Sequence, residues 1–348
     1  MNGGNKLVVP LAIVALAAGL FGISAWRNAQ DANDDALVVY CAHDAVFSEA
    51  VIKRFEEETG IRVRTRFDEE ASKSLGLVNQ IIAERDNPRC DVFWNNQLLN
   101  TLQLKDAGVL EPYKGPGYKR MPDRYKDEDG LWTGFAGRLR VFIVNTERME
   151  CSENTIKKRL AGDLSNVAIA KPLFGTTRSH YSVLWEQLGA DKTKQWHRSL
   201  HQRSIRELPG NSTVRNVVAD GVCDFGFTDT DDYFGAVDRD KPVDALPVRL
   251  DDGSTICIPN TIGIIKGTKR RERAEKFLDW LLSAEQELAM ADSASRQIPL
   301  GKLTRADEAK IPEDVKLLRE WAMDGFDLKR TMESQAACLD WLKAEYLQ

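Results

Sequence analysis

The sequence predicts an α/β protein of two doubly wound lobes joined by crossing strands. Short apolar, β-rich runs alternate with amphipathic helical stretches. The order strand–helix–strand–helix–strand occurs twice, each time followed by a long apolar strand. A length of 348 residues fits two domains. Each series implies a parallel sheet with right-handed crossovers and helices on both faces.

The first series begins after a polar linker. Its strands are predicted at residues 37–41, 62–67 and 91–94, with a long closing strand at 139–144. Between them, apolar residues recur three and four positions apart, as Phe47, Val51 and Phe55 do, which is typical of a helix. Gly60 ends that helix.

The second series repeats this order in the C-terminal part of the chain. Its strands are predicted at residues 167–170, 204–207, 224–228 and 256–266, and its helices at 177–188, 213–219, 270–283, 315–322 and 335–346. If the long strands cross between the lobes, lobe 1 consists of residues 36–137 plus 258–302, and lobe 2 of residues 138–257 plus 303–348. Residues 1–35 are then a signal or anchor with its linker.

The N-terminal segment contains a 20-residue uncharged run, residues 7–26, preceded by Lys6. At 1.5 Å per residue such a helix spans about 30 Å, the thickness of a bilayer core. A cleaved signal peptide and an uncleaved membrane anchor both fit. In either case the rest of the chain is expected outside the cytoplasmic membrane, in the periplasm or an equivalent compartment.

Composition and charge limit the classes of function. With 43% apolar and 29% charged residues the chain can bury a core, which excludes a disordered protein. The net charge of −5 provides no broad basic surface, so no nucleic-acid partner is expected. The six cysteines of an exported chain could form up to three disulfides or remain buried thiols, and both alternatives stay open.

The predicted strand ends carry the candidate site residues. In parallel sheets, ligands bind beyond the carboxyl ends of the strands, where helix N-termini present unpaired N–H groups. The residues suited to a charged solute, above all an anion, are Ser72, Lys73, Ser74, Asn96, Arg138, Arg140, Gly175, Thr176, Thr177, Asn211 and Ser212. The carboxylates suited to a hard cation, which prefers oxygen ligands, are Asp44, Asp229, Asp231 and Asp232. Capping and dipole roles are the structural alternatives.

Catalytic motifs are absent from the sequence. It contains no G-x-S-x-G, H-E-x-x-H, G-x-x-x-x-G-K-[ST] or G-x-G-x-x-G motif. We therefore predict that the protein is not an enzyme and needs no cofactor.

Several segments resemble the extracellular solute-binding proteins of ABC importers, most closely their ferric-iron-binding periplasmic branch. They are residues 37–40, 47–63, 91–94, 137–141, 211–212 and 298–300. The resemblance covers about 300 residues from Ala36 onward. It implies the type 2 periplasmic-binding fold, in which two hinged lobes close over a solute. It also implies a permease and an ATPase as partners and Fe(III) as the transported solute.

The resemblance also implies which positions would hold the metal. Iron-binding members use a side chain after the first strand, a carboxylate after the third and two adjacent tyrosines after the last strand of the second lobe. The matching positions here are Asp44, Asn96 and the pair Asp231–Asp232. Two aspartates therefore stand where the iron-binding members have two tyrosines. The next residue, Tyr233, is a tyrosine.

Three functional hypotheses follow. The first is the solute-binding component of an ABC importer that binds ferric iron or another hard cation between its lobes. The second keeps the fold but replaces the metal with a small charged organic solute, such as an aminophosphonate or a polyamine. The third is a secreted enzyme that uses paired aspartates as acid and base.

Overall fold

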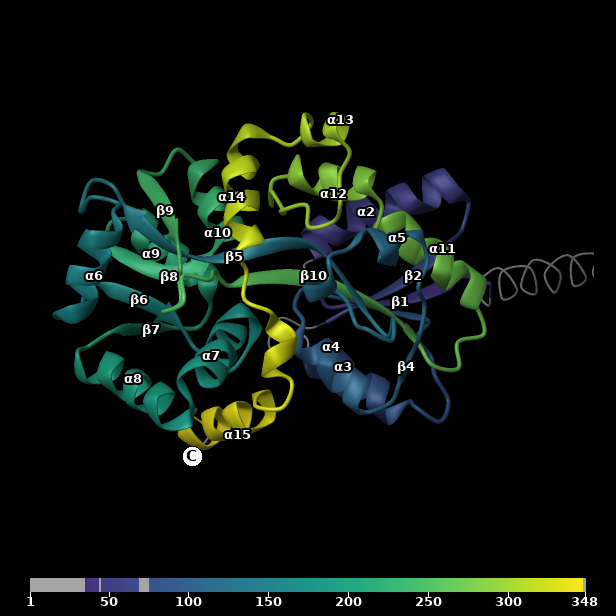
Figure 1. The fold of residues 1–348 in the computed structure, drawn as a ribbon, viewed down its shortest axis with the longest axis horizontal. Coiled ribbons are helices and arrows are strands. Elements are labelled where there is room, and N and C mark those ends of the chain that lie inside the picture. The colour runs from purple at the N-terminus through teal and green to yellow at the C-terminus, as the bar shows by residue number, and fades with distance from the viewer. Residues whose placement is uncertain (1–34, 44, 69–74, 347–348) are drawn as a thin grey trace, which may run out of the picture.

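The computed structural model describes residues 35–43, 45–68 and 75–346. Two α/β halves lie side by side and share long central strands (Figure 1). The strands are β1 (Leu37–Cys41), β2 (Val63–Phe67), β3 (Val92–Asn95), β4 (Leu110–Glu111), β5 (Thr133–Asn145), β6 (Val167–Ala170), β7 (Arg206–Leu208), β8 (Phe225–Asp229), β9 (Val243–Pro247) and β10 (Cys257–Ile265). Their order is β2-β1-β3-β10-β5-β8-β6-β7, with β4 beside β10 and β9 beside β5.

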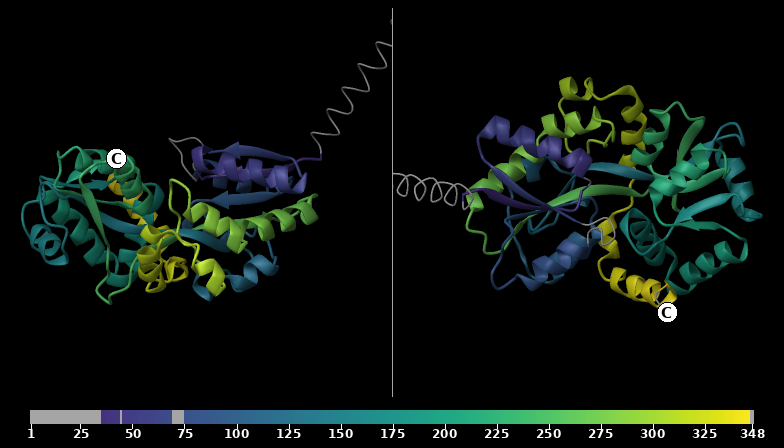
Figure 2. Two further views of the ribbon diagram at one scale, coloured as in Figure 1. Left: turned by 90° about the horizontal axis from the view of Figure 1, so that it is seen from above. Right: turned by 180° about the vertical axis from the view of Figure 1, so that it is seen from behind.

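The helices predicted between the strands are present, together with others. They are α2 (Ala45–Thr59), α3 (Leu75–Ala83), α4 (Leu99–Asp106), α5 (Pro116–Arg120), α6 (Glu153–Ala161), α7 (Gly175–Leu188), α8 (Ala190–Gln202), α9 (Asn211–Ala219), α10 (Thr230–Val237), α11 (Arg271–Leu281), α12 (Ala284–Ala291), α13 (Arg305–Glu308), α14 (Glu313–Met323) and α15 (Gln335–Tyr346), with short 3₁₀ turns η2 (Asp123–Tyr125) and η3 (Leu328–Thr331). Helices such as α5, α6 and α10 are additional to the prediction. The C-terminal helix α15 packs against α7 in the half that carries β6–β8 (Figure 2).

Each half contains a small parallel sheet. β1 pairs in parallel with β2 and β3, and β6 pairs in parallel with β7 and β8. β10 runs antiparallel to β3, β5 runs antiparallel to β8, and β5 and β10 pair with each other between the halves. Two doubly wound halves joined by crossing strands are therefore confirmed. The exact residue boundaries of the two lobes stay a prediction.

The apolar core has a large cluster in each half. One surrounds β1, β3 and β10 and includes Phe55 and Phe277. The other surrounds β6 and β8, includes Phe225, and extends to Leu98 and Leu99 at the start of α4. The second cluster therefore joins side chains from both halves of the molecule.

Strand β5 has a bulge where it passes between the halves. Its register with β10 shifts between Pro259 and Asn260, and Ala136 at the bulge has a φ of +41°, a left-handed value. The Ala136 N–H donates to the buried carboxylate of Glu287 at 2.8 Å. That carboxylate also accepts from Arg120 at 2.7 Å, so the bulge is fixed to α12 and α5.

The structure resolves the cysteine alternatives. None of the six cysteines is paired with another, and all except Cys151 are buried. Burial raises the pKa of the Cys257 thiol to about 11. They are therefore free thiols, the second of the two alternatives.

No helix among the described residues is long and apolar enough to span a membrane. The predicted signal or anchor at residues 7–26 lies outside the described residues.

Candidate functional site

A cleft of about 570 Å³ lies where the strand ends of both halves meet. The predicted site residues that line it are Asn96, Arg138, Gly175, Thr176, Thr177, Asn211, Ser212, Asp229, Asp231 and Asp232. Residues not predicted from the sequence also line it: Ala45, Phe47, Ala170, Lys171, Phe174, Pro209, Gly210 and Arg215. Four predicted residues, Asp44, Ser72, Lys73 and Ser74, lie outside the described residues.

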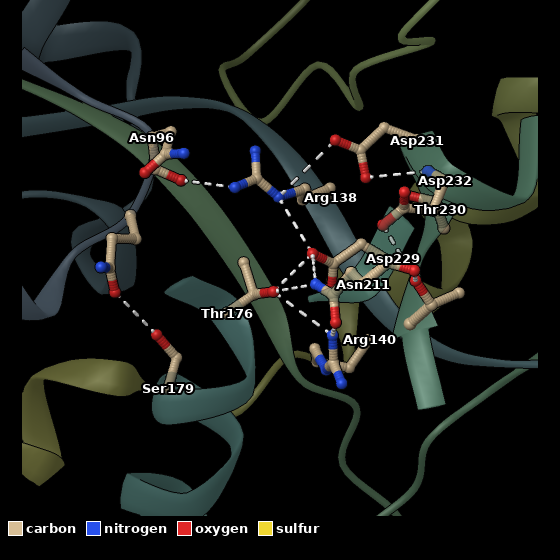
Figure 3. A network of polar contacts seen from close by, with 12 residues as sticks. Asn96, Arg138, Arg140, Thr176, Ser179, Asn211, Asp229, Thr230, Asp231 and Asp232 are labelled. Atoms are coloured by element: carbon tan, nitrogen blue, oxygen red, sulfur yellow. Dashed lines mark hydrogen bonds and ion pairs between the residues drawn. The ribbon is translucent and has the colours of Figure 1, made fainter. Parts of the chain in front are cut away.

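The floor of the cleft is a buried network around Asp229 (Figure 3). Arg140, which is fully buried, donates from Nη1 to Asp229 Oδ1 at 2.7 Å. Thr176 Oγ1 and Asn211 Nδ2 donate to Asp229 Oδ2 at 2.5 and 3.0 Å. The network ties the first turns of α7 and α9 to the end of β8.

This network explains why Arg140 does not line the cleft. On β5, Arg140 is the direct cross-strand partner of Asp229 on β8, so its guanidinium meets the carboxylate below the surface. Arg138, two residues earlier, shares that face of the strand and reaches the cleft. Its Nε lies 3.5 Å from Asp229 and its Nη2 donates to the Asn96 carbonyl oxygen at 2.9 Å. Arg140 as a direct ligand stays a prediction, and in the structure its guanidinium is buried beneath the cleft and supports Asp229.

Asp231 and Asp232 extend the acidic group toward solvent. Carboxylate oxygens of Asp229, Asp231 and Asp232 lie within 4.8 Å of one another. Asp232 accepts from Thr228 Oγ1 at 2.9 Å and lies 3.6 Å from Arg215 Nη1. Burial and the negative charges of Asp231 and Asp229 raise the pKa of Asp232 to about 7. A cation close to Asp232 would stabilise the charged form of this carboxylate.

Three helices begin at the cleft without side-chain caps. The residues preceding α7, α9 and α10 are Phe174, Gly210 and Asp229, and none of them makes a side-chain capping hydrogen bond. The first turns of all three helices line the cleft. Uncapped N–H groups and the helix dipoles favour an anion there. Both α7 and α9 begin two residues earlier than predicted, so Thr176 and Thr177 lie inside the first turn instead of capping it.

The charges of the described cleft residues nearly balance. Three aspartates, Asp229, Asp231 and Asp232, face Arg138, Arg215 and Lys171, and Arg140 lies beneath. The acidic group is therefore compensated by cations of the protein itself. A solute of a single sign would disturb that balance unless it brought a counterion.

Tyrosine does not contribute to the described cleft lining. Tyr233, the tyrosine next to Asp232, packs instead into apolar clusters behind the cleft. Burial raises the pKa of its hydroxyl group. No tyrosine among the described lining residues takes the place of the pair that the resemblance implies for iron.

Polar contacts beside the cleft join the two halves. Ser179 Oγ on α7 donates to Gln97 Oε1 at 3.1 Å, and Arg178 Nη1 donates to Asn100 Oδ1 at 2.8 Å (Figure 3 shows the first contact). All four side chains are buried. α7 therefore contacts both the cleft and the opposite half. One signal for this contact is visible in the sequence, because Gln97 follows a predicted strand end.

Comparison with known proteins identifies the family. A family model described as bacterial extracellular solute-binding protein matches residues 37–292. The chain belongs to this family. The predicted resemblance is thereby confirmed, and this solute-binding protein is a member of a family of binding proteins rather than of enzymes.

The relatives of this solute-binding protein are distant but cover most of it. An uncharacterised protein of Haemophilus influenzae is 26% identical, with 97% of each chain covered. The Fe(3+)-binding periplasmic protein of Serratia marcescens is 25% identical, with 81% of this chain and 83% of the relative covered.

Solved structures confirm the fold. Iron-bound HitA from Pseudomonas aeruginosa superposes with a TM-score of 0.74 at 19% identity, covering 88% of this chain and 99% of HitA. Apo ferric ion-binding protein A from Pasteurella haemolytica gives a TM-score of 0.75 at 18% identity, covering 89% and 97%. The predicted type 2 periplasmic-binding fold is therefore correct.

Proposed function

We propose that this protein is the solute receptor of an ABC importer and that it binds ferric iron together with an anion in the cleft. It would deliver the solute to a permease driven by an ATPase. It would act outside the cytoplasmic membrane, either released or held there by residues 7–26. Relatives named for ferric iron binding support the choice of solute.

The observation that carries the proposal is the carboxylate group beside three uncapped helix starts. Asp231 and Asp232 are the cation ligands in this proposal, since hard cations prefer oxygen. Asp229 instead holds Arg140, because hydrogen bonds already reach both of its oxygens. The anion would lie against Arg138 and the first turns of α7 and α9.

Binding would favour a closed arrangement of the two halves. A solute shifts such an equilibrium only by its difference in affinity between the open and closed states. The solute must therefore contact the first half as well as the second. Asn96 and Phe47 are described first-half residues that line the cleft and can provide such contact.

Titration with ferric citrate tests the proposal. We expect Asp231→Asn and Asp232→Asn each to weaken binding at least tenfold, because each removes a charged oxygen ligand. Asp220→Asn is the matched control, since Asp220 is an exposed aspartate of the same half that pairs with Lys241. Isothermal titration calorimetry measures the affinities. Unchanged iron binding in both cleft variants would contradict this assignment.

A second candidate is supported by the charge balance. The described aspartates are already compensated by arginines and a lysine, and no described lining residue is a tyrosine. Both features suit a small charged organic solute without a metal. Heat from an aminophosphonate, with none from any metal, would favour this candidate. Membership of a family of binding proteins gives the enzyme hypothesis no support.

A further inference from the structure

The cleft is larger than a metal ion and an inorganic anion require. A cation with three or four water-sized ligands occupies on the order of 100 Å³, at about 30 Å³ each. The cleft offers about 570 Å³, within the range of pockets that hold small organic molecules. The cleft therefore has room for an organic part of the solute.

Phe174 is an exposed aromatic ring in a position that usually carries a small polar residue. It precedes the first residue of α7, where Ser, Thr, Asp or Asn would cap the helix, and it makes no capping hydrogen bond. Its side chain lines the cleft and is 43% exposed. An exposed ring on the cleft lining, at a position where a capping residue is usual, is available for contact with a ligand.

Phe47 supplies a second ring from the other half. It lies on α2 after β1, is half-buried, and lines the same cleft. The other described lining residues of that half are Ala45 and Asn96, and the Asn96 carbonyl oxygen already accepts from Arg138. Phe47 is therefore the largest described contact that the first half offers to a solute.

We propose that the solute carries a planar, unsaturated ring that packs between Phe174 and Phe47, while its anionic group lies against Arg138 and the helix starts. A ring held by one phenyl group from each half contacts both halves at once. It thereby supplies the differential affinity that closure requires. Aromatic rings also pack favourably on one another beyond the area they bury.

This inference deepens the proposed function and rests on it only for the location of the site. Two sources fit the same chemistry: an aromatic anion bound alone, or an aromatic anion that chelates ferric iron. In both cases the ring would contact the same two phenyl groups. The presence of the metal is therefore a separate question from the presence of the ring.

Two probes with the same charged group and different size test the ring. Phenylphosphonate and methylphosphonate are titrated by calorimetry into the full protein, each with and without ferric iron. We expect phenylphosphonate to bind about tenfold more tightly than methylphosphonate. In Phe174→Ala and Phe47→Ala the preference for phenylphosphonate should fall below threefold. In Phe174→Tyr, which keeps a ring, it should be retained.

Two control variants keep the result interpretable. Phe174→Leu keeps apolar area without a planar ring, so it should lose most of the preference. Leu317→Ala removes an exposed apolar side chain on α14, away from the cleft lining, and should leave the preference intact. Unchanged circular dichroism melting curves show that each variant is folded.

The outcomes separate the two proposals. The proposed ring contact would be contradicted if the wild-type protein bound both phosphonates with equal affinity. It would also be contradicted if neither bound at millimolar concentration. A preference for phenylphosphonate that survives Phe174→Ala and Phe47→Ala would contradict it as well. Iron-dependent binding without ring preference leaves the iron proposal standing alone. If the protein prefers phenylphosphonate with or without iron and binds no iron, the iron proposal is contradicted and the ring proposal is supported.

Discussion

The two halves of the protein share the same strand–helix alternation but give the cleft different kinds of side chain. The half with β6–β8 contributes three helix starts, Arg215, Lys171 and the aspartates. The described residues of the half with β1–β3 contribute Ala45, Phe47 and Asn96. Among the described lining residues, one half therefore offers charge and hydrogen bonds, and the other offers mainly apolar surface.

The difference indicates an order of events. Of the contacts that the described residues offer, a charged solute finds most of the polar ones on the β6–β8 half, so we expect it to bind there first. The β1–β3 half then closes over it and contributes packing. The charged floor must be rigid before the solute arrives, and the Arg140–Asp229 network provides this rigidity.

The largest expected effect is on that floor. Arg140→Met leaves the buried Asp229 carboxylate without its closest cation, and removal of one partner of a buried pair costs about 3–5 kcal/mol. Urea unfolding measures the loss in the free energy of unfolding. The double variant Arg140→Met/Asp229→Asn should recover part of it. A loss below about 1 kcal/mol in the single variant would show that the floor does not depend on the pair.

The second largest expected effect is destabilisation by acid of the half that carries β6–β8. Burial, and then the positive charge of Arg140, lowers the pKa of His180 to about 3. In the unfolded chain the histidine pKa is about 6.5, so the unfolded state binds the additional proton between these two values. The contribution of neutral His180 to the free energy of unfolding is therefore fully present above about pH 6.5. It is lost progressively as the pH decreases toward 3.

At pH 5, His180 alone should lower the free energy of unfolding by about 2 kcal/mol, at about 1.4 kcal/mol per pH unit. His197, whose pKa burial lowers to about 4, should add to it. Unfolding curves between pH 5 and 7.5 measure the slope. His180→Phe should flatten it, because phenylalanine suits a site next to Trp196 and Phe227 and takes up no proton. An unaltered slope in this variant would assign the acid sensitivity to other groups.

The smallest expected effect concerns the contact between the halves. Ser179→Ala removes a buried hydrogen bond to Gln97 and should cost about 1 kcal/mol. A double-mutant cycle with Gln97→Ala isolates the coupling energy between the two side chains. A coupling near zero would mean that the Ser179–Gln97 hydrogen bond does not help to hold α7 against the opposite half.

The strand ends could be predicted because each rests on local pattern. Apolar runs located the main strands, and the parallel-sheet rule placed Thr176, Asn211 and Asp231 at a common edge. Among the described strands, β4 and β9 were missed, and β5 begins at Thr133 instead of the predicted Leu139. β4 has two residues, and β9 contains an aspartate and a proline, so neither shows a clear strand pattern.

The partners of the site residues could not be predicted. Arg140 and Asp229 are 89 positions apart and meet because β5 and β8 pair in a particular register. Register between distant strands is fixed by the whole sheet. Phe174 was likewise missed, since an aromatic residue near a strand end is assigned to the core unless its exposure is known.

The bulge in β5 has a consequence for how the cleft opens. A single backbone runs from the pairing with β10 into the pairing with β8, so no flexible connector lies along this path. The left-handed Ala136 lies within this continuous strand, where its N–H donates to Glu287. Because Glu287 also accepts from Arg120, a side chain outside the described cleft lining fixes the backbone at the crossing between the halves.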